Sequence, residues 1–131
     1  MHLRSFCFYL RECLPDIRRN GVGEKDLGVF TITFYDNCKA CCEKDKSHPA
    51  YGMTTSGKRA RRGYAACNWL PFDTVLKIEG LGVYTIKDRG AKAFFGTHKK
   101  PTKRIDVWVS SHHEARRLGM QKRRVVLLAV P

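Results

Sequence analysis

The chain has 131 residues, of which 43% are hydrophobic and 28% charged, and its formal net charge is +13. This length is typical of one domain that buries a core without disulfide staples, and the composition is not that of a disordered chain. No stretch approaches the ~20 apolar residues that a membrane-spanning helix needs. The basic excess predicts attraction to polyanions such as nucleic acid, wall polymers or anionic lipid, although it also serves solubility alone.

Residues 1–28 differ from the rest and are expected to form an N-terminal extension or linker. The apolar run near the start stops at Arg11, too early for the h-region of about 7–15 residues in a secretion signal, so no functional signal is expected. Pro15 breaks any long helix here. Residues 18–26 are polar and contain two glycines, as in a turn or linker.

From Val29 onward the pattern is that of a β domain. Short runs of branched and aromatic residues, and one run of small residues at 63–67, predict six strands between turn residues. These cover residues 29–35, 63–67, 74–78, 83–87, 105–109 and 125–130. One short helix is expected after Ser111, because Glu114 follows it in a capping-box pattern and Gly119 ends the helical run. Short strands with turns at regular spacing indicate a barrel or a sandwich.

Eight short motifs occur in an order that resembles the three-aspartate (3D) domain over residues 29–131. The motifs are Thr33-Phe34-Tyr35, Cys38-Lys39-Ala40-Cys41-Cys42, residues 51–57, 63–68, 70–74 and 82–90, Arg104-Ile105-Asp106-Val107, and residues 111–115. Related domains occur in membrane-bound lytic transglycosylase A and in stationary-phase muralytic proteins. The resemblance implies a mainly β fold, a six-stranded double-psi β-barrel with one short helix near the C-terminus.

The resemblance also implies a peptidoglycan-cleaving enzyme, a lytic transglycosylase that cuts the β-1,4 bond after N-acetylmuramic acid. In that reaction the sugar's own 6-hydroxyl group attacks, and a 1,6-anhydro ring forms. The partner would be the peptidoglycan glycan strand, met at the cell wall or outside the cell. No cofactor and no metal are expected.

Two of the family's three aspartates have matches in this chain. By the resemblance, Asp106 would be the main acid/base, and Asp88 would lie beside it. The third position falls on Asn68, and Arg89-Gly90-Ala91 stands where the family has Thr-Gly-Gly. A basic insertion at residues 95–103 is the third departure, and it changes the expected shape of the substrate groove.

The aspartates also suit glycan cleavage on chemical grounds. Cleavage needs a proton on the leaving oxygen, which a carboxylic acid supplies well when its pKa is raised toward neutrality. Two neighbouring carboxyl groups raise the pKa of one of them. Asp106 stands inside an apolar strand, where a charge is costly unless it faces solvent or a partner. Asp88 alone would equally fit a turn before Arg89-Gly90.

Five further side chains are candidates for substrate binding. They are Asn68, Thr54, Thr55, Ser56 and Lys58, whose amide, hydroxyl and ammonium groups suit sugar hydroxyls, carboxylates or acidic substrate groups. An ordinary Ser-Gly turn explains residues 54–57 equally well. Lys58 also begins a charged run that solvation alone would explain.

The cysteines leave several interpretations open. Cys38, Cys41 and Cys42, with Cys67 or His48, resemble half of a zinc site. A disulfide or a packed thiol cluster is favoured, because no second Cys-X-X-Cys is present. The redox compartment is therefore undecided.

Two other functions remain open. Asn68 and Arg89 motivate a catalytically impaired wall-glycan-binding or phage structural module. The basic runs at residues 99–104 and 116–124 motivate a nucleic-acid-binding domain, although no aromatic residues are interleaved for base stacking. The same basic loops would also meet anionic wall polymers. His112 and His113 open the predicted helix and are interpreted as surface residues, because adjacent helix positions do not share a face.

Overall fold

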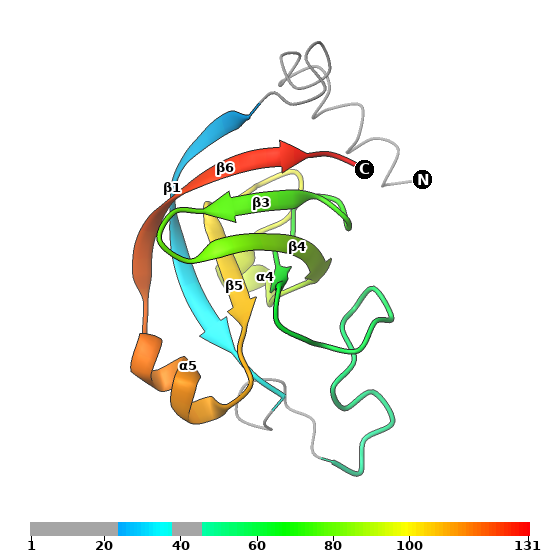
Figure 1. The fold of residues 1–131 in the computed structure, drawn as a ribbon. Helices are drawn as coiled ribbons and strands as arrows, with labels where there is room; N and C mark the ends of the chain where they lie inside the picture. Colours follow the sequence, from blue (N-terminus) through cyan, green and yellow to red (C-terminus); the bar gives the residue numbers. More distant parts are fainter. Residues whose placement is uncertain (1–23, 38–45) are drawn as a thin grey trace.

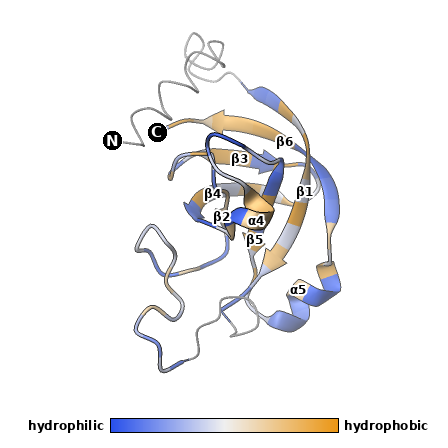
Figure 2. Cartoon of the chain, turned by 180° about the vertical axis from the view of Figure 1, so that it is seen from behind, coloured by the Kyte–Doolittle hydropathy of each residue, from blue (hydrophilic) through white to orange (hydrophobic). Residues whose placement is uncertain are grey.

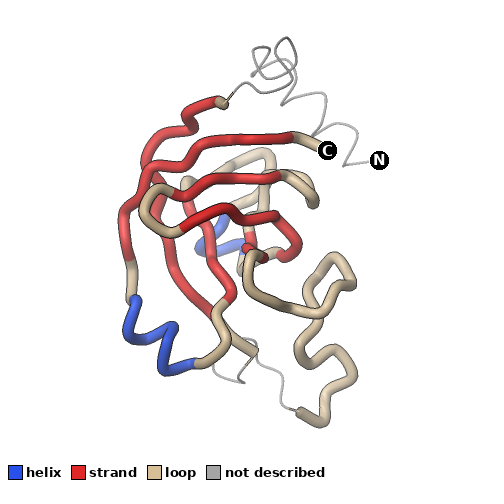
Figure 3. Tube along the Cα trace, in the orientation of Figure 1, coloured by secondary structure: helices blue, strands red, loops and turns tan. Residues whose placement is uncertain are grey.

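The computed structural model describes residues 24–37 and 46–131, and six strands within them form a closed, mainly β barrel (Figure 1). The strands are β1 (Lys25–Tyr35), β2 (Tyr64–Ala66), β3 (Val75–Ile78), β4 (Gly82–Asp88), β5 (Arg104–Trp108) and β6 (Gln121–Ala129). Two short helices accompany them, α4 (Lys92–Phe95) and α5 (His112–Leu118), drawn in blue in Figure 3. The prediction of six strands is confirmed.

The barrel is mixed, and its strand order has an internal two-fold pattern. Neighbours follow the closed order β1-β5-β2-β4-β3-β6. The pairs β1·β5 and β2·β4 are parallel, and the other four pairs are antiparallel. Exchanging β1 with β4, β2 with β5 and β3 with β6 returns the same neighbours and the same directions. Each half of the chain thus supplies three strands in equivalent positions.

Strand alternation decides which side chains fill the barrel. The inward side chains come from every strand and form one core cluster. Its members include Phe30, Ile32, Ala65, Leu76, Ile78, Ile86, Ile105, Val107, Val125 and Leu127, each no more than 2% exposed. Burial of each large member stabilises the fold by about 1.5–3 kcal/mol. Because successive side chains on a strand point to opposite faces, the residue between Ile105 and Val107 must point outward.

Strand β1 begins at Lys25, four residues before the predicted start at Val29. Lys25 and Asp26 pair with Leu127 and Val126 of β6, and a register shift follows at Gly28, whose φ is 94°. The polar composition of this stretch, read as part of a linker, reflects an exposed strand end. The barrel therefore includes residues 25–28, Glu24 is exposed just before it, and the rest of the predicted linker, residues 1–23, lies outside the described range.

The predicted helix is confirmed as α5, whereas α4 was not expected. The Ser111 hydroxyl oxygen accepts a hydrogen bond from the Glu114 backbone N–H at 3.1 Å, and Gly119 ends α5 with a φ of 61°. Helix α4 was not predicted, so the expectation of a single helix is wrong. A four-residue helix is shorter than the span over which helical periodicity is visible. No helix of the described residues has the length and apolar character to cross a membrane.

Candidate active site around Asp88 and Asp106

Ala66 is the register partner of both aspartates. Asp106 lies beside it on β5, and Asp88 lies beside it on β4. Neighbouring strands are about 4.8 Å apart, so a single strand separates the two backbone positions by roughly 10 Å. Ala66 presents only a methyl group between them. The fold thus brings together the two carboxyl groups that the sequence selects.

A bulge at Lys87 puts Asp88 on the outer face. Ala65 pairs with Ile86, whereas Ala66 pairs with Asp88, so the register shifts by one residue. Without that extra residue, alternation from the buried Ile86 would turn Asp88 into the core. Bulges commonly re-aim a side chain in this way near functional sites. Asp88 therefore shares the face that Asp106 occupies.

Asp106 lies in a largely desolvated position with one side-chain donor. The Thr33 hydroxyl, on the neighbouring β1, donates to Asp106 Oδ1 at 3.1 Å. Burial raises the pKa of Asp106 to about 6, and the negative charge of Asp88 adds to the rise, while the Thr33 hydrogen bond and the charge of Arg104 oppose it. A carboxyl group with this pKa holds a proton in mildly acidic solution and can deliver it to a substrate.

Asp88 has the opposite surroundings, with four donors on its carboxylate. Its Oδ1 accepts from the Thr55 N–H at 2.8 Å, the Thr55 hydroxyl at 2.7 Å and the Arg89 N–H at 2.9 Å. Its Oδ2 accepts from the Tyr35 hydroxyl at 2.8 Å. β1 and β4 lie three places apart in either direction round the barrel, so Tyr35 links opposite strands.

Of the side chains predicted to bind substrate, Thr55 alone contacts an aspartate through a hydrogen bond in the described range. Thr54 and Ser56 bond to each other through their hydroxyl groups at 2.9 Å. Thr54 also accepts from the Lys58 backbone N–H at 3.2 Å, and the Ser56 N–H donates to the Lys87 carbonyl. These bonds hold the turn that carries Thr55 to Asp88. The Lys58 side chain is exposed, and substrate contact by these residues stays a prediction.

Asn68 clamps the segment that follows Asp88. Its Nδ2 donates to the carbonyls of Gly90 and Gly96, at 2.8 and 2.9 Å, and its Oδ1 accepts from the Gly90 N–H at 2.7 Å. An aspartate could not donate either of the first two bonds. An amide is therefore the group that this backbone requires at position 68, and both its donor hydrogens are in use. Its predicted contact with substrate stays a prediction.

Arg89 turns away from the aspartates. One Nη atom donates to the carbonyls of Cys67 and Leu70, at 2.6 and 2.9 Å, and the guanidinium lies 3.9 Å from the centre of the Phe72 ring. Burial lowers the pKa of this guanidinium, and the charge of Asp88 partly offsets that effect. No ion pair joins these two described residues. The Arg89 side chain thus makes structural contacts with Cys67, Leu70 and Phe72.

Sequence reasoning missed Thr33, Tyr35 and Arg104 as parts of this site. A signal was present, because Thr33 and Tyr35 stand two residues apart at the end of one strand and so share its outer face. Arg104 stands two residues before Asp106 and therefore shares the outer face of the same strand. What the pattern lacked was the pairing that places β1 beside β5.

The cysteine prediction is only partly accessible. Cys38, Cys41 and Cys42 lie outside the described residues. Cys67 is a free thiol buried in the core cluster, where burial raises its pKa. His48 is exposed, and its Nδ1 accepts from the Ala50 N–H at 3.0 Å. Within residues 24–37 and 46–131, no three His, Cys, Asp or Glu side chains gather as a metal site would require.

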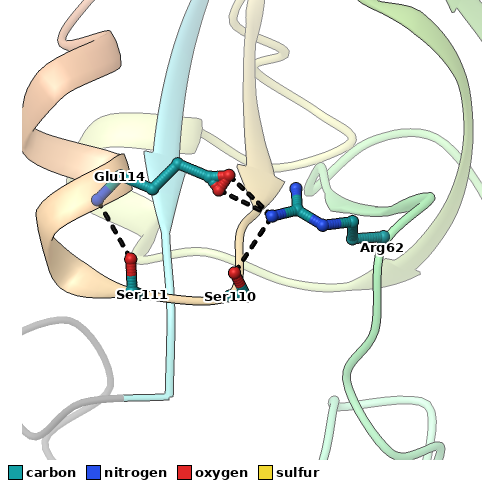
Figure 4. Close-up of polar contacts among 4 residues, drawn as sticks. All are labelled: Arg62, Ser110, Ser111 and Glu114. Atoms are coloured by element: carbon teal, nitrogen blue, oxygen red, sulfur yellow. Dashed lines mark hydrogen bonds and ion pairs between the residues drawn. The ribbon is translucent and has the colours of Figure 1, made fainter.

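A second polar cluster joins α5 to the segment before β2 (Figure 4). The Arg62 guanidinium pairs with Glu114 at 2.7 Å and donates to the Ser110 hydroxyl oxygen at 3.0 Å. This bond to Glu114 raises the pKa of Arg62. A surface hollow beside the helix is lined by His112, His113, Arg116 and Arg117. Neither aspartate lines it.

No protein-family model matches the chain, and no curated protein matches it.

Proposed function

We propose that this protein cleaves peptidoglycan as a lytic transglycosylase, acting on the β-1,4 bond between N-acetylmuramic acid and N-acetylglucosamine. The observation that carries the proposal is the pair of aspartates across Ala66, one buried with a pKa near 6 and one bound by four donors. A double-psi topology belongs to the same proposal. Two parallel pairs and the internal two-fold strand pattern support it.

In this mechanism Asp106 is both acid and base. Its protonated carboxyl group donates to the glycosidic oxygen as the bond to the anomeric carbon breaks. The resulting carboxylate accepts the proton of the 6-hydroxyl group as that oxygen attacks the same carbon. The products are a 1,6-anhydro sugar and a new chain end, and Asp106 regains its proton. The internal nucleophile removes the need for a covalent glycosyl-enzyme, unlike the two-carboxylate retaining scheme.

Asp88 supplies a fixed negative charge beside the reacting sugar. An oxocarbenium-like transition state is positive, so a carboxylate held by four donors stabilises it without reorganising. The Asp88 charge also raises the pKa of Asp106, which keeps the acid protonated. The two carboxyl groups therefore take separate roles from separate surroundings, a recurring arrangement in glycan-cleaving enzymes.

The departures at Asn68 and Arg89, which motivated an impaired binding module, do not count against catalysis. Both side chains bond to backbone carbonyls and stabilise the segment after Asp88. Neither occupies the aspartate carboxylates. An active enzyme acting at the cell wall or outside the cell remains the better proposal.

Digestion of purified sacculi tests the proposal, with products identified by mass. We expect anhydro-muropeptides from the wild-type protein and none from Asp106→Asn. Glu79→Gln is the matched control, because it removes one exposed carboxylate elsewhere on the barrel and should leave activity unchanged. Full activity of Asp106→Asn would remove Asp106 from the mechanism. Reducing sugar ends in place of anhydro ends would make the enzyme a hydrolase, and binding without products would favour the glycan-binding module.

A second candidate function is polyanion binding, favoured by one observation. The hollow on α5 is lined by two histidines and two arginines, and the whole chain carries +13. Anionic wall polymers and nucleic acid both fit this charge. DNA affinity should fall steeply as the salt concentration rises. The double substitution Arg116→Gln with Arg117→Gln should make that fall less steep. Salt-independent or absent binding would reject it.

A further inference from the structure

Arg104 lies next to the proposed acid on the same strand face. It opens β5, and Asp106 follows two residues later, so their Cα atoms are about 6.6 Å apart and their side chains share the outer face. Helix α4 lies against this strand, as Figure 2 shows from behind. The Arg104 guanidinium carbon is 5.5 Å from the centre of the Phe94 ring and 5.2 Å from that of Phe95.

The donors of this guanidinium have no acceptor within the described part of the chain. Its Nε is buried and has no hydrogen-bond partner, and no ion pair joins it to Asp106. The other anchored arginines differ, because Arg62 pairs with Glu114, Arg89 with two carbonyls and Arg124 with Asp26. A buried donor left unsatisfied costs free energy, so it is uncommon in a folded protein. The buried Nε is out of a ligand's reach, so the two Nη groups are the donors that remain to meet an anionic ligand.

The two phenylalanine rings beside Arg104 differ in burial, with Phe95 packed in place and Phe94 exposed to solvent. Phe95 is 6% exposed and packs so closely on Gly90 that a Cβ there would overlap its ring. Asn68 holds the backbone on both sides of α4, at Gly90 and Gly96. Phe94, in contrast, is 61% exposed. One ring therefore positions the guanidinium, and the other presents an apolar face to solvent.

We propose that Arg104 and Phe94 form a subsite for a sugar residue that carries a carboxylate, beside the glycosidic oxygen that Asp106 protonates. The guanidinium edge matches a carboxylate with two parallel hydrogen bonds. The exposed ring packs against the apolar C–H face of the sugar. This inference rests on the proposed glycan cleavage and adds the feature of the substrate that is recognised. The carboxylate belongs either to the lactyl group of a peptide-free sugar or to its stem peptide.

Binding to the Asp106→Asn protein tests this subsite without turnover. Three probes of equal length are compared by calorimetry: a muramic-acid-containing tetrasaccharide with free lactyl groups, the same glycan with stem peptides, and chitotetraose, which has no carboxylate. We expect the carboxylate-bearing glycans to bind about tenfold more tightly than chitotetraose, as one bidentate charged pair would provide. Preference for the first probe identifies the lactyl carboxylate, and preference confined to the second identifies the peptide.

Added to this background, Arg104→Gln should abolish the preference and leave chitotetraose binding unchanged. Arg61→Gln is the matched control, because Arg61 also stacks on an aromatic ring, 4.9 Å from the centre of Tyr64, and should keep the preference. Phe94→Ala alters an exposed side chain and should weaken all three probes severalfold. If Arg104→Gln does not fold, Arg104→Lys replaces it in the test. This variant keeps the positive charge but loses the paired N–H donors, so it should reduce the preference for carboxylate-bearing glycans, and Phe94→Ala tests the ring separately.

Equal binding of the three probes, or a preference that survives in folded Arg104→Gln, would overturn the subsite. Cleavage of sacculi by the wild-type protein together with that result would leave the proposed function standing. Conversely, an Arg104-dependent preference without any cleavage would retain the subsite and reject the enzyme.

Discussion

Asp88 and Asp106 flank the same alanine, yet the barrel treats them differently. Asp106 lies inside a strand, receives one hydroxyl donor and has a pKa raised to about 6. Asp88 ends a strand and receives four donors. The difference follows from position, because the backbone N–H groups around Asp106 are used by ladders on both sides, whereas those near a strand end are free to donate. Two identical side chains thus have different surroundings, and the proposed mechanism gives them different roles.

The largest expected effect is on the rate at which the protein cleaves sacculi. Asp106→Asn should lower turnover of sacculi by about 10²–10⁴-fold, the range that general acid–base catalysis contributes. In the wild-type protein the rate should fall as the pH rises through about 6, because Asp106 must be protonated. Asp88→Asn should move that fall to lower pH, since the Asp88 charge raises the pKa of Asp106. A fall at unchanged pH in Asp88→Asn would contradict the coupling.

The same substitution should have opposite effects on stability at the two positions. The folded pKa of Asp106, about 6, exceeds its ordinary value of 3.8, so folding favours the protonated form and the fold loses stability as the pH rises from about 4 to about 6. Asp106→Asn removes that loss and should raise the free energy of unfolding at pH 8 by about 1–3 kcal/mol, with little gain at pH 4. Asp88→Asn should lower it by about 2 kcal/mol, because a neutral amide oxygen accepts the three hydrogen bonds on Oδ1 more weakly than a carboxylate does.

Urea denaturation of both variants at pH 4 and pH 8 measures this contrast. Glu79→Gln again serves as the control, with no pH-dependent difference from the wild-type protein expected. Equal destabilisation by the two substitutions at pH 8 would show that their surroundings do not differ as described.

A comparable effect on stability is expected from the bond that joins opposite strands. Tyr35→Phe removes the hydroxyl that donates to Asp88 at 2.8 Å and should lower the free energy of unfolding by about 1.5–3 kcal/mol, the usual cost for a bond to a charged group. Tyr84→Phe is the matched control, because its hydroxyl makes only a 3.4 Å bond to the Leu81 carbonyl. Its loss should be smaller. Equal losses would remove the special role of the Tyr35 bond.

The smallest effect concerns the Thr33 hydroxyl, which donates to Asp106. Thr33→Val keeps the shape of the side chain and removes a hydrogen bond that lowers the pKa of Asp106. The pKa of Asp106 should therefore rise further, by less than about one unit. NMR titration of the carboxyl carbon measures it directly, and the pH of the fall in rate should move upward by the same amount. A downward shift would contradict the assigned sign.

Local pattern alone predicted the parts of this protein that depend on near neighbours. Five runs rich in branched residues and one run of small residues became six strands, and Ser111 with Glu114 and Gly119 marked both ends of α5. The alternation around Asp106 placed it opposite Ile105 and Val107, and the core confirms that both neighbours are buried. These features follow from periods of two residues and from caps within one turn, which any short segment displays.

Tertiary structure alone decided how those parts meet. The Tyr35–Asp88 bond joins residues 53 apart in sequence, and the Thr33–Asp106 bond joins residues 73 apart. The bulge that turns Asp88 outward forms only against β2. The requirement for an amide at Asn68 comes from the Gly90 and Gly96 carbonyls, more than 20 residues away in sequence. The two-fold strand order has no repeat in the residues to reveal it. Strand pairing and register depend on contacts between distant segments, and a short run of residues carries no record of which segment will lie beside it.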